Sequence, residues 1–384
     1  MVILRNRYKT ATALLALGTI LLCGAAVFLI HCRLSSSKKA AALSSAHKTG
    51  TEASAPPIKK TADGCWESRQ KIYFNIPAHI LITSPDVSEK LAHRAIYRAW
   101  AEFERLGRIF NPFDPAAEVA RINRNSGGGG VPVSADLYRA LKISRNLWDK
   151  SNGCFDPTFL PIKRLWHHAE EIQEIPSERK ILKTLRHTGF ENVGIESEKR
   201  NRVRIENPPI RFDFGGIAKG YAVDQVRQLL KKNGISDGLV QLGGEVAAFG
   251  RNRGSPWRIG IEHPKKNMVQ PWGVISRNGQ IRVSTSGNYR QPLRIQGQTF
   301  YHIFSPETGK PVSEKVLGVT TLSVTGTRSN ALLDGAATAI TVMGARNGVE
   351  FADKMGIEAL ILTRGHDQTI RETMTPGFPD FPGR

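Results

Sequence analysis

A short stretch near the middle of the chain, Arg211-Phe-Asp-Phe-Gly-Gly-Ile-Ala-Lys-Gly-Tyr221, places strong limits on the local fold. Apolar residues recur at helical spacing from Val223 to Leu230 until Gly234 ends the pattern, so we expect the glycines between a strand and a helix. Glycines let backbone N–H groups come close to a ligand, and a helix N-terminus carries partial positive charge. With the ammonium group of Lys219, the stretch is a candidate phosphate-binding turn.

Two familiar phosphate-binding motifs do not fit this stretch. A P-loop needs Gly-x-x-x-x-Gly-Lys-Ser/Thr, which is absent, and the adjacent Gly215 and Gly216 do not fit Gly-x-Gly-x-x-Gly. A glycine pair before a helix is more often a tight turn than a nucleotide site. The stretch by itself leaves both interpretations open.

The composition indicates a protein that buries a proper core and has a basic surface. The chain has 384 residues, of which 40% are hydrophobic, and a formal net charge of +20. Its basic doublets are spread along the chain, and no zinc-finger or RNA-binding signature accompanies them. We therefore expect no nucleic-acid partner.

The N-terminal region contains a candidate membrane anchor. Residues 12–30 are uncharged and mostly apolar, which is long enough for a helix that crosses a bilayer. The run ends in Phe-Leu-Ile-His-Cys and not in a small-x-small cleavage site, which favours an uncleaved anchor. Arg5, Arg7 and Lys9 precede it and favour a cytoplasmic N-terminus. The expected location is the inner membrane, single pass, with the folded body on the periplasmic or extracytoplasmic side.

Composition shifts divide the chain into four parts. The segment after the anchor is rich in Ser, Ala, Lys, Thr and Pro and has no apolar periodicity, as in a solvated tether. The expected parts are a cytoplasmic stub and membrane anchor at 1–32, a disordered linker at 33–64, a folded domain at 65–365 and an irregular tail at 366–384.

The four cysteines show no metal-ligand spacing. Cys23 and Cys32 lie in or beside the predicted span, and no Cys-x-x-Cys pair occurs. Cys65 and Cys154 can form a disulfide if the body is exported, and geometry decides whether they do.

Helical and strand-like patterns are mixed along the body. We expect a helix that starts at Ser84-Pro85 and runs to Leu106, and another that Ser134 caps. Strands are expected at 71–83, 239–250, 257–261, 281–289, 318–326 and 357–363, a hairpin around 193–205, and further helices near 119–122, 177–185 and 329–344.

Three further positions are candidates for chemistry, each with a plain structural alternative. Asp334 and Thr338 are four residues apart and project from one helical face, where two oxygen ligands suit Mg²⁺, although a solvated pair explains them too. His302 lies before a turn, where a lone histidine is usually structural. Cys154-Phe-Asp-Pro-Thr158 has the form of an Asp-Pro turn.

Taken together, the motifs resemble one family, the flavin transferases of the ApbE type (FAD:protein FMN transferases). The resemblance covers about residues 103–363. The motifs that carry it, in order, are Asp213-Phe-Gly-Gly-Ile-Ala-Lys-Gly-Tyr-Ala-Val-Asp224, Ser284-Thr-Ser-Gly-Asn-Tyr289, His302-Ile-Phe-Ser-Pro-Glu-Thr-Gly309 and Leu333-Asp-Gly-Ala-Ala-Thr-Ala339.

The resemblance implies an α+β, bilobal ApbE-like fold that binds FAD between its lobes, with Mg²⁺ on the diphosphate. It implies transfer of FMN from FAD to a threonine or serine hydroxyl of a membrane or exported target protein, with release of AMP. Transfer of this kind depends on neutralising the diphosphate charge and on positioning the attacking hydroxyl.

The resemblance also implies roles for individual residues. It makes Asp334 and Thr338 the ligands of Mg²⁺, and His302 the base for the incoming hydroxyl, a role its ordinary pKa permits. Backbone carbonyls of Gly216 and Ala218 would complete the metal site. The implied FAD contacts are Asp156, Asp213, Lys219, Ile303 and Phe304, with Asn111, Pro112 and Phe113 along the flavin.

Some positions depart from the family pattern. The family usually has Asp where Ser305 stands, often Asp where Asn288 stands, and commonly Ala-Asp-Ala where Leu333-Asp-Gly stands, and its Met-Gly-Thr signature is not recognisable in 71–83. Three alternatives to transfer therefore stay open: an FAD pyrophosphatase that forms FMN and AMP, a non-catalytic flavin-binding protein, and a basic protein without a ligand.

Overall fold

The computed structural model describes most of the chain after the candidate anchor. The described residues are 56–72, 76–127, 129–197, 200–206, 210–265, 268–287, 292–312, 315–323, 326–365 and 367–381. The predicted span at 12–30 lies outside them. No helix within the described residues is long and apolar enough to cross a membrane.

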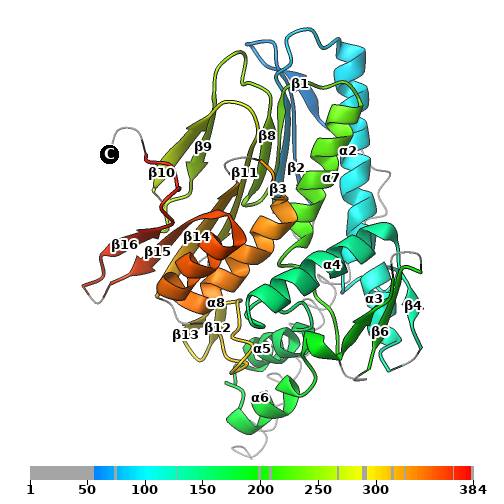
Figure 1. Cartoon of the computed structure of the whole chain (residues 1–384), viewed down its shortest axis with the longest axis vertical. Coiled ribbons are helices and arrows are strands. Elements are labelled where there is room, and N and C mark those ends of the chain that lie inside the picture. The colour runs from blue at the N-terminus through cyan, green and yellow to red at the C-terminus, as the bar shows by residue number, and fades with distance from the viewer. Residues whose placement is uncertain are drawn as a thin grey trace, which may run out of the picture. The chain divides into compact units, whose positions relative to one another are not determined.

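A nine-stranded sheet is the central layer, and every pair of neighbouring strands in it is antiparallel (Figure 1). The strands follow one another across the sheet in the order in which they occur in the sequence, and other elements lie in some of the connections between them. In spatial order the strands are β1 (Ile58–Lys60), β2 (Trp66–Ile72), β3 (Ile76–Ile82), β7 (Gly238–Leu242), β8 (Glu245–Phe249), β11 (Ile281–Gly287), β14 (Val316–Ser323), β15 (Glu358–Arg364) and β16 (Ile370–Met374).

Three long helices, α2 (Glu89–Phe110), α7 (Ala218–Lys232) and α8 (Asn330–Met355), cover one face of this sheet. The apolar face of α2 repeats at helical spacing, its buried residues include the small Ala95 and Ala99, and the helix packs against α7. Many of the buried residues of α8, which packs against both the sheet and α7, are also small. This packing brings the first turns of α7 and α8 together.

The opposite face of the sheet is covered as well. The hairpin of β9 (Trp257–Ile261) and β10 (Gly273–Arg277) packs there with Phe378 from the C-terminal segment. Strands β8 and β14 are consequently buried at every position. A strand covered on both faces shows no alternation of apolar and polar residues.

The remaining elements pack at one end of the long helices (Figure 1). They include a three-stranded sheet and a separate apolar cluster that two helices form with a short hairpin. The elements are α3 (Glu118–Arg124), β4 (Val131–Pro132), α4 (Ala135–Lys150), α5 (Leu160–Ile172), α6 (Glu178–Leu185), η1 (Phe190–Asn192), β5 (Val193–Ile195), β6 (Arg202–Ile205), β12 (Leu293–Ile295) and β13 (Gln298–Phe300). The expected α+β class is confirmed.

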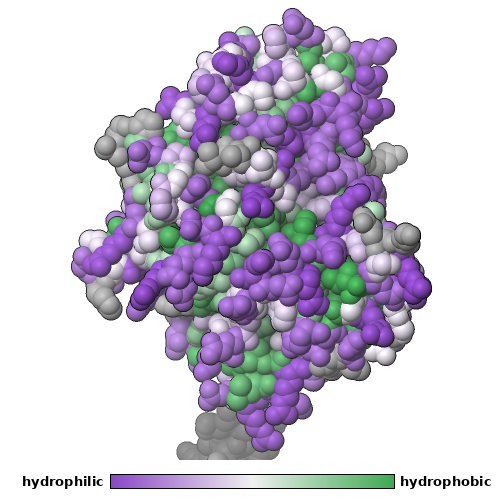
Figure 2. All heavy atoms as spheres, viewed as in Figure 1, coloured by the Kyte–Doolittle hydropathy of each residue, from purple (hydrophilic) through white to green (hydrophobic). Residues whose placement is uncertain are grey.

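The face of the molecule shown in Figure 2 is mainly hydrophilic, as expected for a chain whose charged residues are spread along the sequence. Smaller apolar areas lie between the hydrophilic residues on this face (Figure 2). Among the described residues, few large apolar side chains are exposed, and Phe113 is one of them.

The start of α2 was predicted wrongly. The helix begins at Glu89, and Ser88 caps it by accepting a hydrogen bond from Leu91 N–H at 3.3 Å. Ser84 was the predicted cap, but its hydroxyl accepts from Asp237 N–H at 2.9 Å and donates to the Asp237 carbonyl at 3.1 Å. The hydrogen bonds to the distant Asp237 therefore keep Ser84 from capping the helix, although Ser84 had the stronger capping signal in the sequence.

Two predicted strands are hairpins. The range 71–83 contains the end of β2 and all of β3, which pair with each other. The range 239–250 folds into β7 and β8 around Gly243-Gly244, with Gly243 in the left-handed region at φ +61°. A Cβ on Gly244 would lie 2.5 Å from the Thr285 carbonyl oxygen. The tight turn makes Glu245 the first residue of a buried strand.

The structure also differs from the sequence prediction near the ends of the body. β1 forms within the range predicted as linker, and β16 forms within the predicted irregular tail. Helix α5 was not predicted. Gly344 interrupts α8 where the helix was expected to end, but helical residues continue to Met355. Cys65 and Cys154 are both free thiols, so the disulfide considered above is absent from the structure.

Candidate active site

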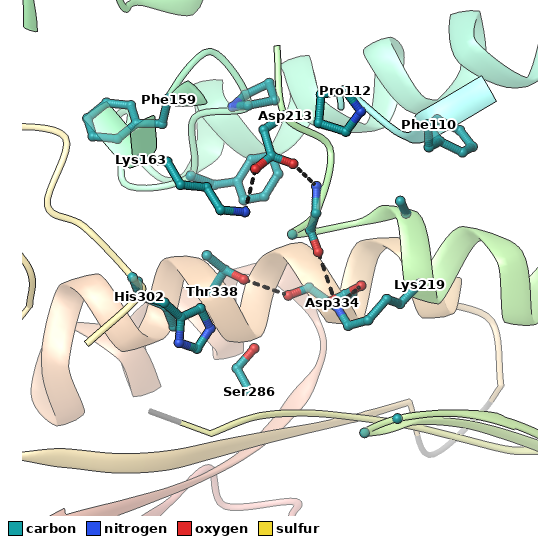
Figure 3. Close-up of a pocket in the computed structure, with 18 of the residues that line it drawn as sticks. Phe110, Pro112, Phe159, Lys163, Asp213, Lys219, Ser286, His302, Asp334 and Thr338 are labelled. Atoms are coloured by element: carbon teal, nitrogen blue, oxygen red, sulfur yellow. Dashed lines mark hydrogen bonds and ion pairs between the residues drawn. The ribbon is translucent and has the colours of Figure 1, made fainter. Parts of the chain in front are cut away.

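One cavity of about 400 Å³ brings the sequence motifs together (Figure 3). Its walls come from α8, the glycine-rich turn before α7, the end of α2, the Asp-Pro segment and the end of β11. Every residue that the sequence singled out for the site lines it: Asn111, Pro112, Phe113, Asp156, Asp213, Gly216, Ala218, Lys219, His302, Ile303, Phe304, Asp334 and Thr338.

The Asp-Pro segment and the glycine-rich turn are joined by backbone contacts. Asp213 N–H donates to the Pro157 carbonyl at 2.8 Å. The Asp213 carboxylate then accepts from Gly215 N–H at 2.8 Å and from Lys163 Nζ at 2.7 Å. Burial alone would raise the pKa of Asp213, but Lys163 and the Gly215 N–H hold it below its ordinary value. Asp213 is therefore negatively charged, and its hydrogen bond from Gly215 N–H holds the glycine-rich turn in place.

Helices α7 and α8 meet at Gly220. A Cβ there would lie 2.3 Å from the Asn330 carbonyl oxygen, so only glycine allows this approach. Gly220 N–H donates to Asp334 Oδ2 at 3.1 Å, and Asp224 Oδ2 accepts from Ala331 N–H at 3.1 Å. The first turns of the two helices are thus tied together on both sides of the contact.

Asp334 lies at the centre of the cavity wall and is only 1% exposed. Lys219 Nζ contacts both of its carboxylate oxygens, at 2.9 and 3.0 Å, and also the Gly215 carbonyl at 3.1 Å. Thr338 Oγ1 lies one turn further along α8 and donates to the Asp334 carbonyl at 3.2 Å. Burial raises the pKa of Asp334, and the Lys219 ammonium opposes that rise.

Glu245, which the sequence analysis did not single out, is a second buried carboxyl beside this pair. Its Oε1 lies 3.8 Å from Lys219 Nζ, and the residue is 0% exposed. Burial and the neighbouring Asp334 carboxylate raise the pKa of Glu245 well above its usual range. The available signal was a single acid at the start of an otherwise apolar strand, directly after a glycine pair.

The oxygen groups around Lys219 suit a hard divalent cation. The Asp334 carboxylate, the Thr338 hydroxyl and the Gly215 carbonyl are oxygen groups of the kinds that Mg²⁺ accepts as ligands. The ammonium group of Lys219 already rests on Asp334 and Gly215, which shows that these oxygens attract a cation. The described residues contain no cluster of three His, Cys, Asp or Glu side chains that could hold a metal ion, so a cation here would depend on one carboxylate together with hydroxyl and carbonyl oxygens.

His302 follows β13, and its ring faces the cavity near Thr338 and Ser286 (Figure 3). Within the described part of the chain, its Nδ1 has no hydrogen-bond partner. Burial lowers the pKa of His302 to about 4, with further contributions from Lys163 and Lys219. The imidazole is therefore neutral at physiological pH and able to accept a proton.

The other wall of the cavity is largely apolar. Phe110 and Phe159 lie along it with the 111–113 loop, which Asn111 shapes by accepting from Phe113 N–H at 3.0 Å. Asp156 also lines the cavity, but its Oδ1 accepts from both the N–H and the hydroxyl of Thr158, at 2.7 and 2.6 Å. The geometry gives Asp156 a turn-forming role, and burial raises its pKa to about 6.

The departures from the family pattern fall at different places. Asn288 lies outside the described residues. Ser305 shapes a turn by accepting from Gly309 N–H at its carbonyl, and it is not among the described residues that line the cavity. A Cβ on Gly335 would lie 2.3 Å from Leu147 Cδ1, so Leu147 leaves room for glycine at the position where the family commonly has alanine.

Lys163 is an additional cavity residue that the sequence analysis missed, because helix α5 was not predicted.

Comparisons with known proteins agree with these motifs. The model of the ApbE family matches residues 75–361. A protein from Vibrio cholerae named FAD:protein FMN transferase is 31% identical over 268 residues, which cover 69% of this chain and 78% of the relative. An Escherichia coli protein of the same name is 26% identical and covers 77% of this chain and 84% of the relative.

Solved structures support the same relationship. The crystal structure of an ApbE protein from Thermotoga maritima has a TM-score of 0.71 and 27% identity, with 80% of this chain and 97% of that chain covered. The flavin transferase ApbE from Vibrio cholerae has a TM-score of 0.69 and 25% identity, with 85% and 100% covered. The predicted ApbE-like fold is confirmed.

Proposed function

The chain belongs to the ApbE family, and from this premise we propose that it transfers the FMN half of FAD to a hydroxyl group of a target protein. The observation that carries the proposal is the cavity in which Lys219, Asp334 and His302 meet. In the reaction, a threonine or serine oxygen of the target attacks the FMN phosphorus. A phosphoester bond forms, the bond to the AMP phosphate breaks, and AMP leaves.

We propose that Asp334 and Thr338 hold Mg²⁺, with carbonyls of the glycine-rich turn at Gly216 and Ala218 completing the protein ligands. The observed Gly215 carbonyl contact to Lys219 adds a third carbonyl of the same turn. When bound, Mg²⁺ neutralises negative charge on the diphosphate. Lys219 adds its own positive charge on the same side of the cavity, where diphosphate oxygens would otherwise repel Asp334.

The apolar wall is the proposed site for the rings of FAD. Pro112 and Phe113 line it at the end of α2, and Ile303 with Phe304 lines it beyond β13. Flat apolar side chains suit a flavin or adenine ring, since they remove its faces from water. Asp213 holds Lys163 and the glycine-rich turn in place between this wall and the metal side.

His302 is the proposed acceptor of the hydroxyl proton, because its imidazole lines the cavity beside Thr338 (Figure 3). Because the pKa of His302 is lowered to about 4, the base form is present above that pH and is lost as pH falls through it. We expect kcat/KM for transfer to stay level from about pH 8 to about pH 5 and to fall below that range. An acid limb near the ordinary histidine pKa would contradict this assignment.

A substitution separates this role from a structural one. His302→Asn is expected to lower transfer by about 10²–10⁴-fold and to flatten the acid limb, because the general base is lost. The matched control is His168→Asn on α5, whose side chain is 56% exposed. The control is expected to keep both the rate and the pH profile of the unchanged protein.

Covalent labelling tests the function as a whole. The folded body is incubated with FAD, Mg²⁺ and a target domain that carries an acceptor threonine, and the denatured target is examined for bound flavin fluorescence and for a mass increase of one FMN less one water. Labelling that depends on Mg²⁺ is the expected result. FMN and AMP formed equally fast without target would instead indicate a pyrophosphatase, and intact bound FAD would indicate a non-catalytic flavin-binding protein.

We also propose that residues 12–30 anchor the chain in the inner membrane with its body on the extracytoplasmic side. The uncharged length of that segment and the basic residues before it support this proposal. The partner would then be a membrane or exported protein. Protease protection of the body in intact cells, followed by its loss when the outer barrier is opened, is the expected result.

A further inference from the structure

Two fully buried carboxyl groups lie within reach of one ammonium group in the cavity. Lys219 Nζ binds both oxygens of Asp334 at 2.9 and 3.0 Å, and it lies 3.8 Å from Glu245 Oε1. Neither Glu245 oxygen has a partner with hydrogen-bond geometry among the described residues. A buried carboxyl group without such a partner is unfavourable and calls for an explanation.

The position of Lys219 bears on metal binding. Its Nζ occupies the Asp334 carboxylate and the Gly215 carbonyl, which belong to the oxygen groups proposed for Mg²⁺. An ammonium group and a divalent cation repel each other strongly at such distances in a buried site. Lys219 therefore has to leave Asp334 when the metal binds.

We propose that Lys219 exchanges partners, moving from Asp334 to Glu245 when a divalent cation binds, and that Glu245 is the positioning residue for this exchange. The inference rests on the metal site of the proposed function. It brings Lys219 to hydrogen-bond distance of Glu245, whose oxygens have no partner of that geometry among the described residues, and leaves the Asp334 oxygens open to the metal. Glu245 itself binds no metal in this scheme.

The local geometry favours Glu245 as the second partner. A movement of about 1 Å would bring Lys219 Nζ from 3.8 Å to hydrogen-bond distance of Glu245 Oε1. The lysine side chain has a flexible four-carbon stem, so its ammonium group moves while α7 stays in place. Glu245 opens the buried strand β8 directly after the tight Gly243-Gly244 turn, which fixes its backbone.

A double-mutant cycle on metal affinity tests the exchange without any turnover. Mn²⁺ is used as the probe, FAD is omitted, and free Mn²⁺ is measured by electron paramagnetic resonance for the unchanged protein, Glu245→Gln, Lys219→Met and the double variant. Glu245→Gln is expected to weaken binding by about tenfold or more, because Lys219 then stays on Asp334. Lys219→Met is expected to tighten binding, since the competing cation is gone.

The decisive comparison is Glu245→Gln in the Lys219→Met background, where we expect no further change in affinity. Equal weakening in both backgrounds would make Glu245 a direct metal ligand and overturn the exchange. Weaker binding in Lys219→Met would also overturn it, even if Glu245→Gln failed to fold. Glu350→Gln on the exposed side of α8 is the control, and thermal unfolding with EDTA checks each variant.

The inference and the proposed function fail differently. Absence of Mn²⁺ binding in all four proteins would overturn both the exchange and the proposed metal site. Additive effects in the cycle, with normal flavin labelling of a target, would overturn the exchange alone. The expected cycle without any labelling would support the exchange and refute flavin transfer.

Discussion

Replacing Asp334 with asparagine is expected to reduce flavin transfer by about a thousandfold, which corresponds to a loss of several kcal/mol of transition-state stabilisation. The carboxylate is only 1% exposed, and Lys219 shows that its two oxygens act together on one cation. An amide keeps the shape of the side chain but lacks the charge. The rate of FMN attachment to the target, measured at saturating Mg²⁺, is the test.

The control for this prediction comes from the same helix. Asp353→Asn changes an exposed acid near the C-terminal end of α8 and should leave the labelling rate unchanged. Circular dichroism is needed for Asp334→Asn, because the substitution also removes the ion-pair partner of Lys219. A folded Asp334→Asn protein that keeps more than about a tenth of the rate would refute the metal-binding role.

Gly220→Ala is expected to lower the free energy of unfolding by about 2–3 kcal/mol. In an exposed helix this change would stabilise by roughly 1 kcal/mol, because alanine favours the helical conformation. Here the added Cβ would lie 2.3 Å from the Asn330 carbonyl oxygen and 2.8 Å from Ala331 N. Both are backbone atoms that cannot rotate away, so the steric clash outweighs the helix propensity of alanine and the substitution destabilises the protein.

The same substitution should impair the site. Any separation of α7 from α8 lengthens the contacts of Gly220 N–H and Lys219 with Asp334, both about 3 Å long here. Urea denaturation gives the stability, and labelling at low temperature gives the activity of the folded fraction. Gly129→Ala is the control, because a Cβ there meets nothing within 4 Å. A Gly220→Ala protein as stable as the control would show that α7 and α8 can move apart without a loss of stability.

Several features followed from local sequence alone. The Ser134 cap on α4 formed as predicted, with its hydroxyl accepting from Leu137 N–H at 3.2 Å. The hairpin around 193–205 and the helix near 177–185 also formed. Helical spacing of four residues correctly placed Asp334 and Thr338 on one face of α8. These are short-range consequences of backbone geometry, which neighbouring residues determine.

Other features depended on contacts between distant residues. Ser84 lost its capping role to Asp237, which lies 153 positions away. Glu245 became a site residue only because a glycine turn and two covered sheet faces buried it beside Lys219. Lys163 reached Asp213 across 50 positions from a helix that was not predicted. A pattern of residues that are close in the sequence does not predict contacts between residues that are far apart in it.

The family, the order of the motifs and the residue types that gather in the cavity were predictable from the residues of the chain. The pairing of their charges depends on the fold: Lys219 contacts Asp334 across 115 positions, and Glu245 has no hydrogen-bond partner among the described residues. The physical reason is that burial sets the strength of each charge interaction. Burial results from the packing of α7, α8 and the sheet as a whole, which a single segment of sequence does not encode.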